Sequence, residues 1–344
     1  MDEIGWGILA TGKIAHSIAA DLALVPGARL AAVGSRRLAS AEAFAARHGA
    51  GQHPAPAAYG SYEELVADPA VDVVYVATPH ALHLDHARLA FEAGKHVLCE
   101  KPLTLNLAEA EEMVALARQH DRFLMEAMWT ACHPVVRRVA ADLRAGRFGT
   151  PRHFHAELGF RVDAPAEDRM LNPELGASAL LDMGIYPLTV AHLFLGEAEE
   201  LHAVASLSEG GIDLDVALTG RYPGGALATM TASMTSWSSR AAALATDRGR
   251  IDLDDFHHPT RATFTPYAEG GSNDVDARRE PVHVVGDEPV IGRGYGNEIA
   301  EVVRCLRAGL RESPLVPHAQ TVALMRQMDD LRAQIGVRYA VDDS

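Results

Sequence analysis

Short apolar runs alternate with longer helical segments up to about residue 128, and this alternation constrains the fold more than any other feature of the chain. Apolar runs of this kind are typical of parallel strands that are buried on both faces. A helix between two successive strands returns the chain to the same edge, so the strands run parallel. The pattern therefore predicts an α/β fold with a doubly wound parallel sheet. The expected strands cover residues 4–9, 29–33, 72–77, 97–99 and 123–128.

The pattern changes after about residue 150. Turn sequences at residues 222–225 (Tyr-Pro-Gly-Gly) and 247–250 (Asp-Arg-Gly-Arg) each join two strand-like segments, which predicts antiparallel pairs. Residues 177–195 have a helical pattern, and two amphipathic helices are expected within residues 297–336, where they pack back on the core. We expect an α+β domain with a largely antiparallel open sheet. A length of 344 residues fits two domains, placed at residues 1–127 and 128–344.

Composition excludes several classes of protein. The net charge of −15 argues against nucleic acid and anionic membranes as partners, because both select basic surfaces. The three cysteines, Cys99, Cys132 and Cys305, are odd in number and widely spaced, as in proteins of a reducing compartment. The acidic start of the chain lacks the pattern of a signal peptide, and no apolar stretch is expected to reach the ~18 residues that span a bilayer. We expect a soluble cytoplasmic protein.

The turn between the first strand and the first helix has the pattern of a dinucleotide site. Its sequence matches G-x-G-x-x-G/A with alanine in place of the first glycine. Backbone amides at a helix N-terminus bind a pyrophosphate, and a glycine lets the phosphate approach closely. The alternative is an ordinary turn between a strand and a helix. The residues predicted to bind the cofactor here are Ala10, Thr11, Gly12, Lys13 and Ile14.

The end of the second strand indicates which cofactor is bound. An NAD site usually has an acidic residue about 20 positions after the glycines, where it binds the ribose 2′-hydroxyl. This chain has Ser35, Arg36 and Arg37 there instead. A guanidinium binds a phosphate with two parallel hydrogen bonds, so Ser35 and Arg36 favour NADP (NADPH) over NAD. The alternative is that the two arginines form a solvated charged pair.

Two motifs carry a family resemblance. Residues 94–102 (Gly-Lys-His-Val-Leu-Cys-Glu-Lys-Pro) place Lys101 after a strand, at the edge of a parallel sheet where ligands bind. They resemble the signature of the glucose–fructose oxidoreductase/inositol dehydrogenase (Gfo/Idh/MocA) family. Residues 176–186 resemble that family's G-G-x-L-x-D-x-G-x-H motif, with Tyr186 in place of histidine. The resemblance covers essentially the whole chain, and residues 126–129 make it most similar to the dimeric dihydrodiol dehydrogenase and NADP-linked sugar dehydrogenase branch.

The resemblance implies a redox enzyme with Lys101, Asp182 and Tyr186 as its catalytic group. A tyrosine hydroxyl can relay the substrate proton, but the ordinary pKa of a phenol is about 10, and a nearby ammonium lowers that pKa. Asp182 would orient the lysine or a substrate hydroxyl. If the segment is helical, Asp182 and Tyr186 share a helix face, because they are four residues apart. Pro187, however, disfavours helical geometry at Tyr186. The resemblance also implies that the NADP-binding domain is of the Rossmann type. Its implied cofactor-binding residues are Thr78, Pro79, His80, His83, Glu100, Lys101 and Trp129.

Several functions stay open at this point. The first is an NADP-dependent oxidoreductase acting on a sugar, cyclitol or trans-dihydrodiol. The alternatives are an NAD(P)-dependent glycosidase and a non-catalytic regulator that binds the cofactor. The three-residue spacing of His80, His83 and His86 suits one helix face, but zinc usually needs a fourth ligand, so no metal is expected. A sheet face without helices in the second domain would suit a homodimer or a dimer of dimers.

Overall fold

The computed structural model describes residues 3–52, 54–267 and 279–343. The chain forms two compact units. The first unit contains Met1–Cys132, Glu174–Gly176 and Val290–Arg326; the second contains His133–Pro173, Ala177–Pro289 and Gln327–Ser344. The division therefore differs from a single cut after residue 127. Most of the closing segment belongs to the first unit, and helix α10 (His318–Ile335) contributes residues to both.

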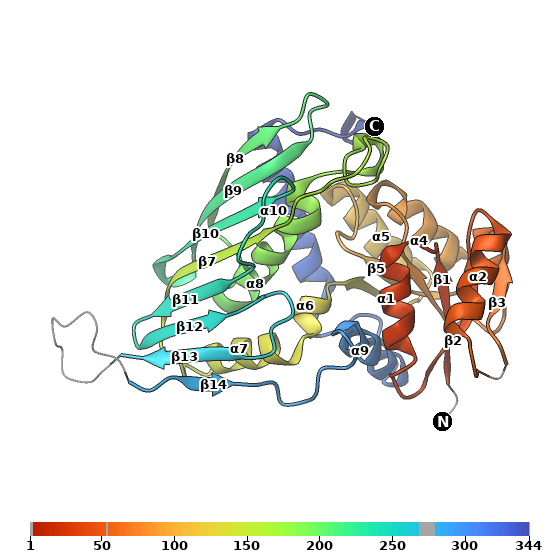
Figure 1. Ribbon diagram of the computed structural model, residues 1–344, viewed down its shortest axis with the longest axis horizontal. Helices are drawn as coiled ribbons and strands as arrows, with labels where there is room; N and C mark the ends of the chain where they lie inside the picture. The colour runs from red at the N-terminus through yellow and green to blue at the C-terminus, as the bar shows by residue number, and fades with distance from the viewer. Residues whose placement is uncertain (1–2, 53, 268–278, 344) are drawn as a thin grey trace. The chain divides into compact units, whose positions relative to one another are not determined.

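The first unit is built on a six-stranded parallel sheet with strand order β3-β2-β1-β4-β5-β6. This order confirms the predicted doubly wound fold, since the sheet grows from β1 in both directions. Figure 1 labels β1, β2, β3 and β5 of this sheet. The strands are β1 (Ile4–Leu9), β2 (Ala28–Gly34), β3 (Ala57–Tyr59), β4 (Val73–Val76), β5 (His96–Glu100) and β6 (Leu124–Ala127). The helices are α1 (Lys13–Leu22), α2 (Leu38–His48), α3 (Tyr62–Ala67), α4 (His83–Glu92), α5 (Leu107–Gln119) and α6 (Trp129–Cys132).

Helix α9 (Tyr295–Arg307) completes the first unit by packing on α1, α6 and β2. Its N-terminus is held by Asp21 of α1, which accepts hydrogen bonds from the amides of Arg293 (2.8 Å) and Gly296 (3.1 Å). A carboxylate at this position satisfies amides that have no partner inside the helix. The closing segment is thereby tied to the first helix of the parallel-sheet unit.

The second unit contains an eight-stranded sheet with order β14-β13-β12-β11-β7-β10-β9-β8. The predicted turns join β9 to β10 and β11 to β12, and these pairs are antiparallel. Among the described strands of this second sheet, the one parallel pair is β7 with β10, so the sheet is largely antiparallel, as predicted. The strands are β7 (Pro151–Gly159), β8 (Glu200–Leu207), β9 (Asp213–Tyr222), β10 (Ala226–Ser233), β11 (Ala242–Thr246), β12 (Gly249–Leu253), β13 (Ala262–Pro266) and β14 (Val282–Val284).

One face of this sheet is covered by helices of the second unit. Helix α8 (Ile185–Leu195) packs on β7 and β10, and α7 (Pro134–Arg144) packs on α8 and β14 (Figure 1). Side chains along β10 alternate between buried and more exposed, as expected for a sheet with a single covered face. Apolar side chains such as Val204 and Leu227 are exposed on the sheet strands.

One expectation about apolar length was wrong. The helical segment Pro173–Leu195 has 23 residues and is long and apolar enough to cross a membrane by length and composition. However, 83% of its most apolar window is buried inside the structure, as in the core helix of a folded domain. Burial in the core accounts for the apolar run, and it is the one such helix among the described residues.

Candidate active site

The cofactor turn follows β1 and leads directly into α1. Ala10 has a φ of 87°, which is the left-handed conformation that favours glycine. Its amide donates to the carbonyl of Gly34 at the end of β2 (3.0 Å), which holds the turn against the neighbouring strand. The alanine that replaces the first glycine of the fingerprint therefore adopts the conformation for which glycine is normally used.

The N-terminus of α1 is open to an anion. Gly12 is its N-cap and provides no side-chain cap, and no acidic residue lies in the first turn. By contrast, α3 is capped by Ser61 and α5 by Asn106, each through a hydrogen bond to a helix amide. A Cβ atom placed on Gly12 would meet nothing within 4 Å. Both observations fit a phosphate bound next to the α1 amides.

The predicted site residues follow four different strands at one edge of the sheet. Ala10 follows β1, Ser35 follows β2, Thr78 follows β4 and Lys101 follows β5. In the strand order β2-β1-β4-β5 these four positions are neighbours at the carboxyl ends. The order reverses between β1 and β4, and open α/β sheets bind ligands at such a point. Ser35 is buried, and Arg36 after it is exposed.

His80 and His83 are structural elements of this edge. His80 is buried, and its Nδ1 lies 3.1 Å from the carbonyl oxygen of Gly176. His83 is fully buried, with Nε2 2.9 Å from the carbonyl oxygen of Thr78 and Nδ1 3.0 Å from that of Pro102. Burial lowers the pKa of His83 to about 4, although these carbonyl contacts oppose the shift. The ring therefore links the end of β4 to the turn that carries Lys101, and both its nitrogens face backbone rather than a ligand.

The histidines that were considered as metal ligands face different partners. Nδ1 of His86 lies 3.0 Å from Oγ1 of Thr78, whereas His80 and His83 lie on the backbone carbonyls described above. Pro79 lies between Thr78 and His80 at the start of the short helical turn His80–Leu82. The three rings consequently organise the loop after β4 through separate contacts.

Lys101 lies at the end of β5 with only 9% of its surface exposed. Its amide donates to Oε2 of Glu100 (3.2 Å), and the hydroxyl of the fully buried Tyr75 donates to Oε1 of the same carboxylate. Glu126 accepts hydrogen bonds from the amide of Leu103 (2.9 Å) and the hydroxyl of Thr321 (3.0 Å). Burial raises the pKa of Glu126 to about 7, and the positive charge of Lys101 opposes that shift.

Glu298 of α9 is a buried carboxyl group beside Glu100. It is fully buried, and neither of its side-chain oxygens has a hydrogen-bond partner. Burial, together with the charges of Glu100 and Asp21, raises its pKa well above the ordinary value. An unpaired charge at such a place is costly, so Glu298 is held in the protonated form.

Glu298→Gln should change how stability depends on pH. Because the folded pKa is raised, the wild-type protein loses stability as pH rises above about 4.5, the ordinary value, whereas the glutamine variant does not. We expect the unfolding free energy of the variant minus that of the wild type to grow as the pH rises from about 5 to about 8. Each pH unit by which the folded pKa of Glu298 lies above its ordinary value adds on the order of 1.4 kcal/mol to the total difference. Denaturant unfolding at several pH values measures this, with the exposed Glu92→Gln as control. A pH-independent difference would contradict it.

Trp129 is placed inside the fold. Its side chain is buried and stacks on Tyr295 of α9, with ring centroids 4.3 Å apart and planes at 16°. Stacked aromatic pairs stabilise a core beyond the area that they bury. The prediction that Trp129 binds the cofactor is not tested by this contact, which gives the residue a packing role between α6 and α9.

Asp182 and Tyr186 lie in one helical segment of the second unit. Asp182 is in a π-helical turn, Leu180–Gly184, in which the amide of Ile185 donates to the carbonyl of Leu180. Tyr186 is the second residue of α8, which continues directly from this turn, so the backbone is helical at Tyr186 although Pro187 follows it. Asp182 is nearly buried, and one of its oxygens accepts a hydrogen bond from Arg169 at 3.4 Å.

A second group of polar residues meets Tyr186 through His257 and was missed by the sequence reasoning. The ring of Tyr186 meets the edge of His257 with centroids 5.5 Å apart. Donor atoms of Asp255, His257 and His258 lie within 4.8 Å of one another, the one group among the described residues that could hold a metal ion. A guanidinium nitrogen of Arg240 lies 3.0 Å from Asp255, so this carboxylate already has a cationic partner. The adjacent histidines were the available signal in the sequence.

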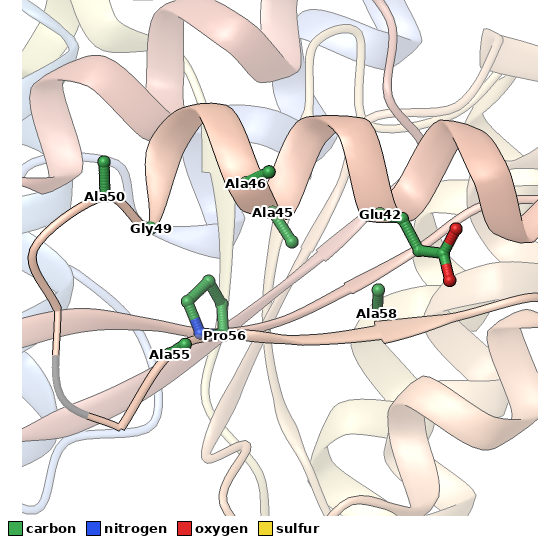
Figure 2. Close-up of a pocket in the computed structure, with 8 residues that line it drawn as sticks. All are labelled: Glu42, Ala45, Ala46, Gly49, Ala50, Ala55, Pro56 and Ala58. Atoms are coloured by element: carbon green, nitrogen blue, oxygen red, sulfur yellow. The ribbon is translucent and has the colours of Figure 1, made fainter.

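A shallow hollow on α2 is separate from this site. Figure 2 shows its lining, in which no predicted site residue takes part. The lining is small and mostly apolar, with Glu42 as its one charged side chain. It consists of Glu42, Ala45, Ala46, Gly49, Ala50, Ala55, Pro56 and Ala58.

Fold and site together define a nucleotide-binding oxidoreductase. Residues 4–128 match the model of the oxidoreductase family with an NAD-binding Rossmann fold, and residues 136–252 match the GFO/IDH/MocA C-terminal domain. The chain belongs to the GFO/IDH/MocA family, as the two sequence motifs predicted.

Named relatives span the whole chain. Trans-1,2-dihydrobenzene-1,2-diol dehydrogenase from Mus musculus is 34% identical over 349 residues, covering 98% of both chains. The same enzyme from Danio rerio is 35% identical, also with 98% coverage of both. A solved 3-ketoreductase from Actinomadura kijaniata, in complex with NADP and TDP-benzene, is 26% identical with a TM-score of 0.84, covering 98% of this chain and 99% of that chain. Structures of that ketoreductase with a lysine replaced by alanine or a tyrosine by phenylalanine also match.

Proposed function

We propose that this protein is an NADP-dependent oxidoreductase that transfers hydride to or from a hydroxyl or carbonyl carbon of a sugar, cyclitol or trans-dihydrodiol. The observation that carries the proposal is the position of Lys101. It directly follows β5 at the carboxyl edge of the sheet, and β5 is separated from the cofactor turn after β1 by β4 alone. A lysine at this point lies where a nucleotide-binding sheet places its ligand.

The residues at the α1 N-terminus fit a dinucleotide. Gly12 leaves space for a phosphate, and the first turn of α1 carries no acidic side chain to repel it. When bound, a nicotinamide cofactor supplies or takes up the hydride. Ser35 and Arg36 at the end of β2 would hold the 2′-phosphate, because a hydroxyl and an exposed guanidinium stand where an NAD site has a carboxylate. Lys13 and Ile14 in the first turn of α1 would border the pyrophosphate.

In this proposal Tyr186 moves the proton of the reaction. During oxidation its phenolate takes the proton of the substrate hydroxyl, and during reduction its phenol donates a proton to the carbonyl oxygen. Lys101 would stabilise the phenolate and orient the substrate oxygen. Asp182, which is nearly buried, would orient the lysine or a second substrate hydroxyl.

The substrate class is supported by the relatives. The curated relatives are named for a dihydrodiol, and the ketoreductase was solved with a nucleotide-linked compound and NADP. Both names describe chemistry at a carbon that bears oxygen. We therefore assign a small diol, sugar or cyclitol as substrate, without nucleic acid, membrane or metal as a partner.

A parallel titration with NADPH and NADH tests the cofactor assignment. Arg36→Ala should raise the Kd for NADPH roughly 10- to 100-fold, because a charge-assisted contact contributes about 1.5–3 kcal/mol, and should change the Kd for NADH less than about threefold. Gly12→Ala is the matched control: its Cβ would occupy the open space beside α1, so it should weaken both cofactors to a similar extent. Fluorescence of the reduced nicotinamide gives both constants.

The other outcomes favour other functions. Equal affinities for NADPH and NADH in the wild-type protein would overturn the role of Arg36. No binding of either cofactor would rule out an oxidoreductase of this kind, and binding without turnover of any diol or sugar would favour the regulator. A cofactor that stays bound and unchanged while a glycosidic bond is broken would indicate the glycosidase.

We also propose a homodimer or a dimer of dimers. The second sheet has one face covered by helices, and apolar side chains such as Val204 and Leu227 are exposed on its strands. Exposed apolar side chains of this kind occur at contacts between subunits. Light scattering on the purified protein gives the mass directly, and a monomer at micromolar concentration would contradict this part of the proposal.

A further inference from the structure

The ring contact between Tyr186 and His257 joins two distant parts of the second unit. Tyr186 lies in α8, and His257 lies in the loop between β12 and β13. The ring centroids are 5.5 Å apart and the planes meet at 63°, so the rings pack edge to face. His257 has a side chain that is only 13% exposed. A histidine is thus held against the tyrosine to which the proposed function gives the proton.

Asp255 organises the loop that carries His257. Its Oδ1 lies 3.0 Å from Nδ1 of His257 and 3.3 Å from Nδ1 of His258, and its Oδ2 lies 3.0 Å from a nitrogen of Arg240. Asp255 and Arg240 both have left-handed backbones, with φ of 52° and 58°. Such conformations are unusual for residues other than glycine and persist where the surroundings enforce them. Phe256, the residue after Asp255, is fully buried, and its amide donates to the carbonyl of Arg240 (2.9 Å).

The closeness of Asp255 to Nδ1 favours one tautomer of His257. A carboxylate beside Nδ1 stabilises the tautomer with hydrogen on Nδ1, which leaves a lone pair on Nε2. The same carboxylate stabilises the imidazolium that forms when Nε2 takes up a proton. A half-buried carboxylate and an imidazole next to a proton-transferring hydroxyl are the parts of a proton relay.

We propose that His257, held by Asp255, is a positioning residue that exchanges a proton with Tyr186 and connects this tyrosine to solvent during turnover. The inference rests on the proposed function of Tyr186. In oxidation, the hydroxyl proton of Tyr186 passes to Nε2 of His257, and the phenolate that remains accepts the proton of the substrate hydroxyl. Water then takes up the proton that the imidazolium carries. Reduction runs the same transfers in reverse. The hydride moves separately, so no further reactant is needed.

Several titratable groups surround His257. Burial lowers its pKa below the ordinary 6.5, Asp255 opposes this shift, and His258 and Arg240 reinforce it. His133 is close enough for His257 and His258 to lower its pKa, after burial, to about 4. Tyr186 faces the ring from α8. A neutral His257 is therefore the form present near neutral pH, ready to accept a proton.

The test compares two neighbouring histidines. His257→Phe keeps a ring beside Tyr186 but removes the nitrogens, whereas His258→Phe removes the other histidine at Asp255. We expect His257→Phe to lower kcat roughly 10- to 100-fold and to abolish the acid limb of the pH profile for oxidation, because water replaces the relay poorly. His258→Phe should stay within about threefold of wild type, since it leaves the contact with Tyr186 in place. Cofactor Kd should be unchanged in both.

A third variant separates the relay from a purely structural role. Asp255→Asn keeps a residue that tolerates the left-handed backbone but removes the charge, so the acid limb should move to lower pH. Equal losses in His257→Phe and His258→Phe, or an unchanged pH profile in His257→Phe, would overturn the proposal. If Tyr186→Phe were also fully active, the proposed function of Tyr186 would fail as well; if Tyr186→Phe is inactive while His257→Phe is normal, only the relay fails.

Discussion

Tyr186→Phe should lower kcat by a factor on the order of 10²–10⁴ while leaving the Kd for NADPH within about threefold of wild type. The variant keeps the aromatic ring in the first turn of α8 and its packing against His257, and removes only the hydroxyl. A phenol that transfers the substrate proton in the transition state affects kcat and kcat/KM together. Steady-state kinetics in both directions, on a diol or sugar that the wild-type protein turns over, measures the loss.

Tyr222→Phe is the matched control. Tyr222 also lies in the second unit, and its hydroxyl is buried without a hydrogen-bond partner. Removing that hydroxyl should leave kcat unchanged and leave stability equal or higher, since an unpaired buried polar group is costly. Retention of more than about one tenth of wild-type kcat in Tyr186→Phe would show that another group moves the proton.

Lys101→Met should lower kcat by a factor on the order of 10²–10⁴ and shift the activity for oxidation to higher pH. Methionine preserves much of the length and volume of this side chain, which is only 9% exposed, but carries no charge. Without the ammonium the phenolate is less stable, so the phenol loses its proton at higher pH and the rise of oxidation activity with pH moves to higher pH. The pH dependence of kcat and kcat/KM distinguishes this from a general loss of folding.

Lys95→Met is the control for the second prediction. Lys95 lies at the opposite end of β5, where its ammonium donates to the carbonyls of Asp68 and Val71, both at 2.8 Å. Its loss should reduce the unfolding free energy by about 1–3 kcal/mol without changing the pH profile. If Lys101→Met showed only such a stability loss, with kcat intact in the folded fraction, Lys101 would have no part in the chemistry.

The carboxyl edge of the parallel sheet was predictable because it depends on local order along the chain. Apolar strands followed by turns at Ala10, Ser35, Thr78 and Lys101 define the carboxyl ends of a parallel sheet, and the strand order then makes them neighbours. Even the substituted glycine position was identified, although the sequence does not reveal that Ala10 adopts a φ of 87°.

Side-chain direction was much harder to predict. Trp129 stacks on Tyr295, which is 166 positions later in the chain, and His83 turns both ring nitrogens toward the carbonyls of Thr78 and Pro102. The spacing of residues along one helix predicts which of them share a face, but it does not predict which distant segment covers that face. The same limit hid Glu298, whose acidic residue type suggests an exposed charge until α9 is packed against the sheet.

The sequence by itself determined the fold class, the family and the set of motifs, because periodicity, turn chemistry and short signatures are local properties of the chain. The tertiary structure decided which residues surround those motifs. His257 reaches Tyr186 only because the loop after β12 folds onto the start of α8, about 70 positions earlier in the chain. Long-range contacts of this kind depend on how whole elements pack, and burial then sets the charge that each group carries.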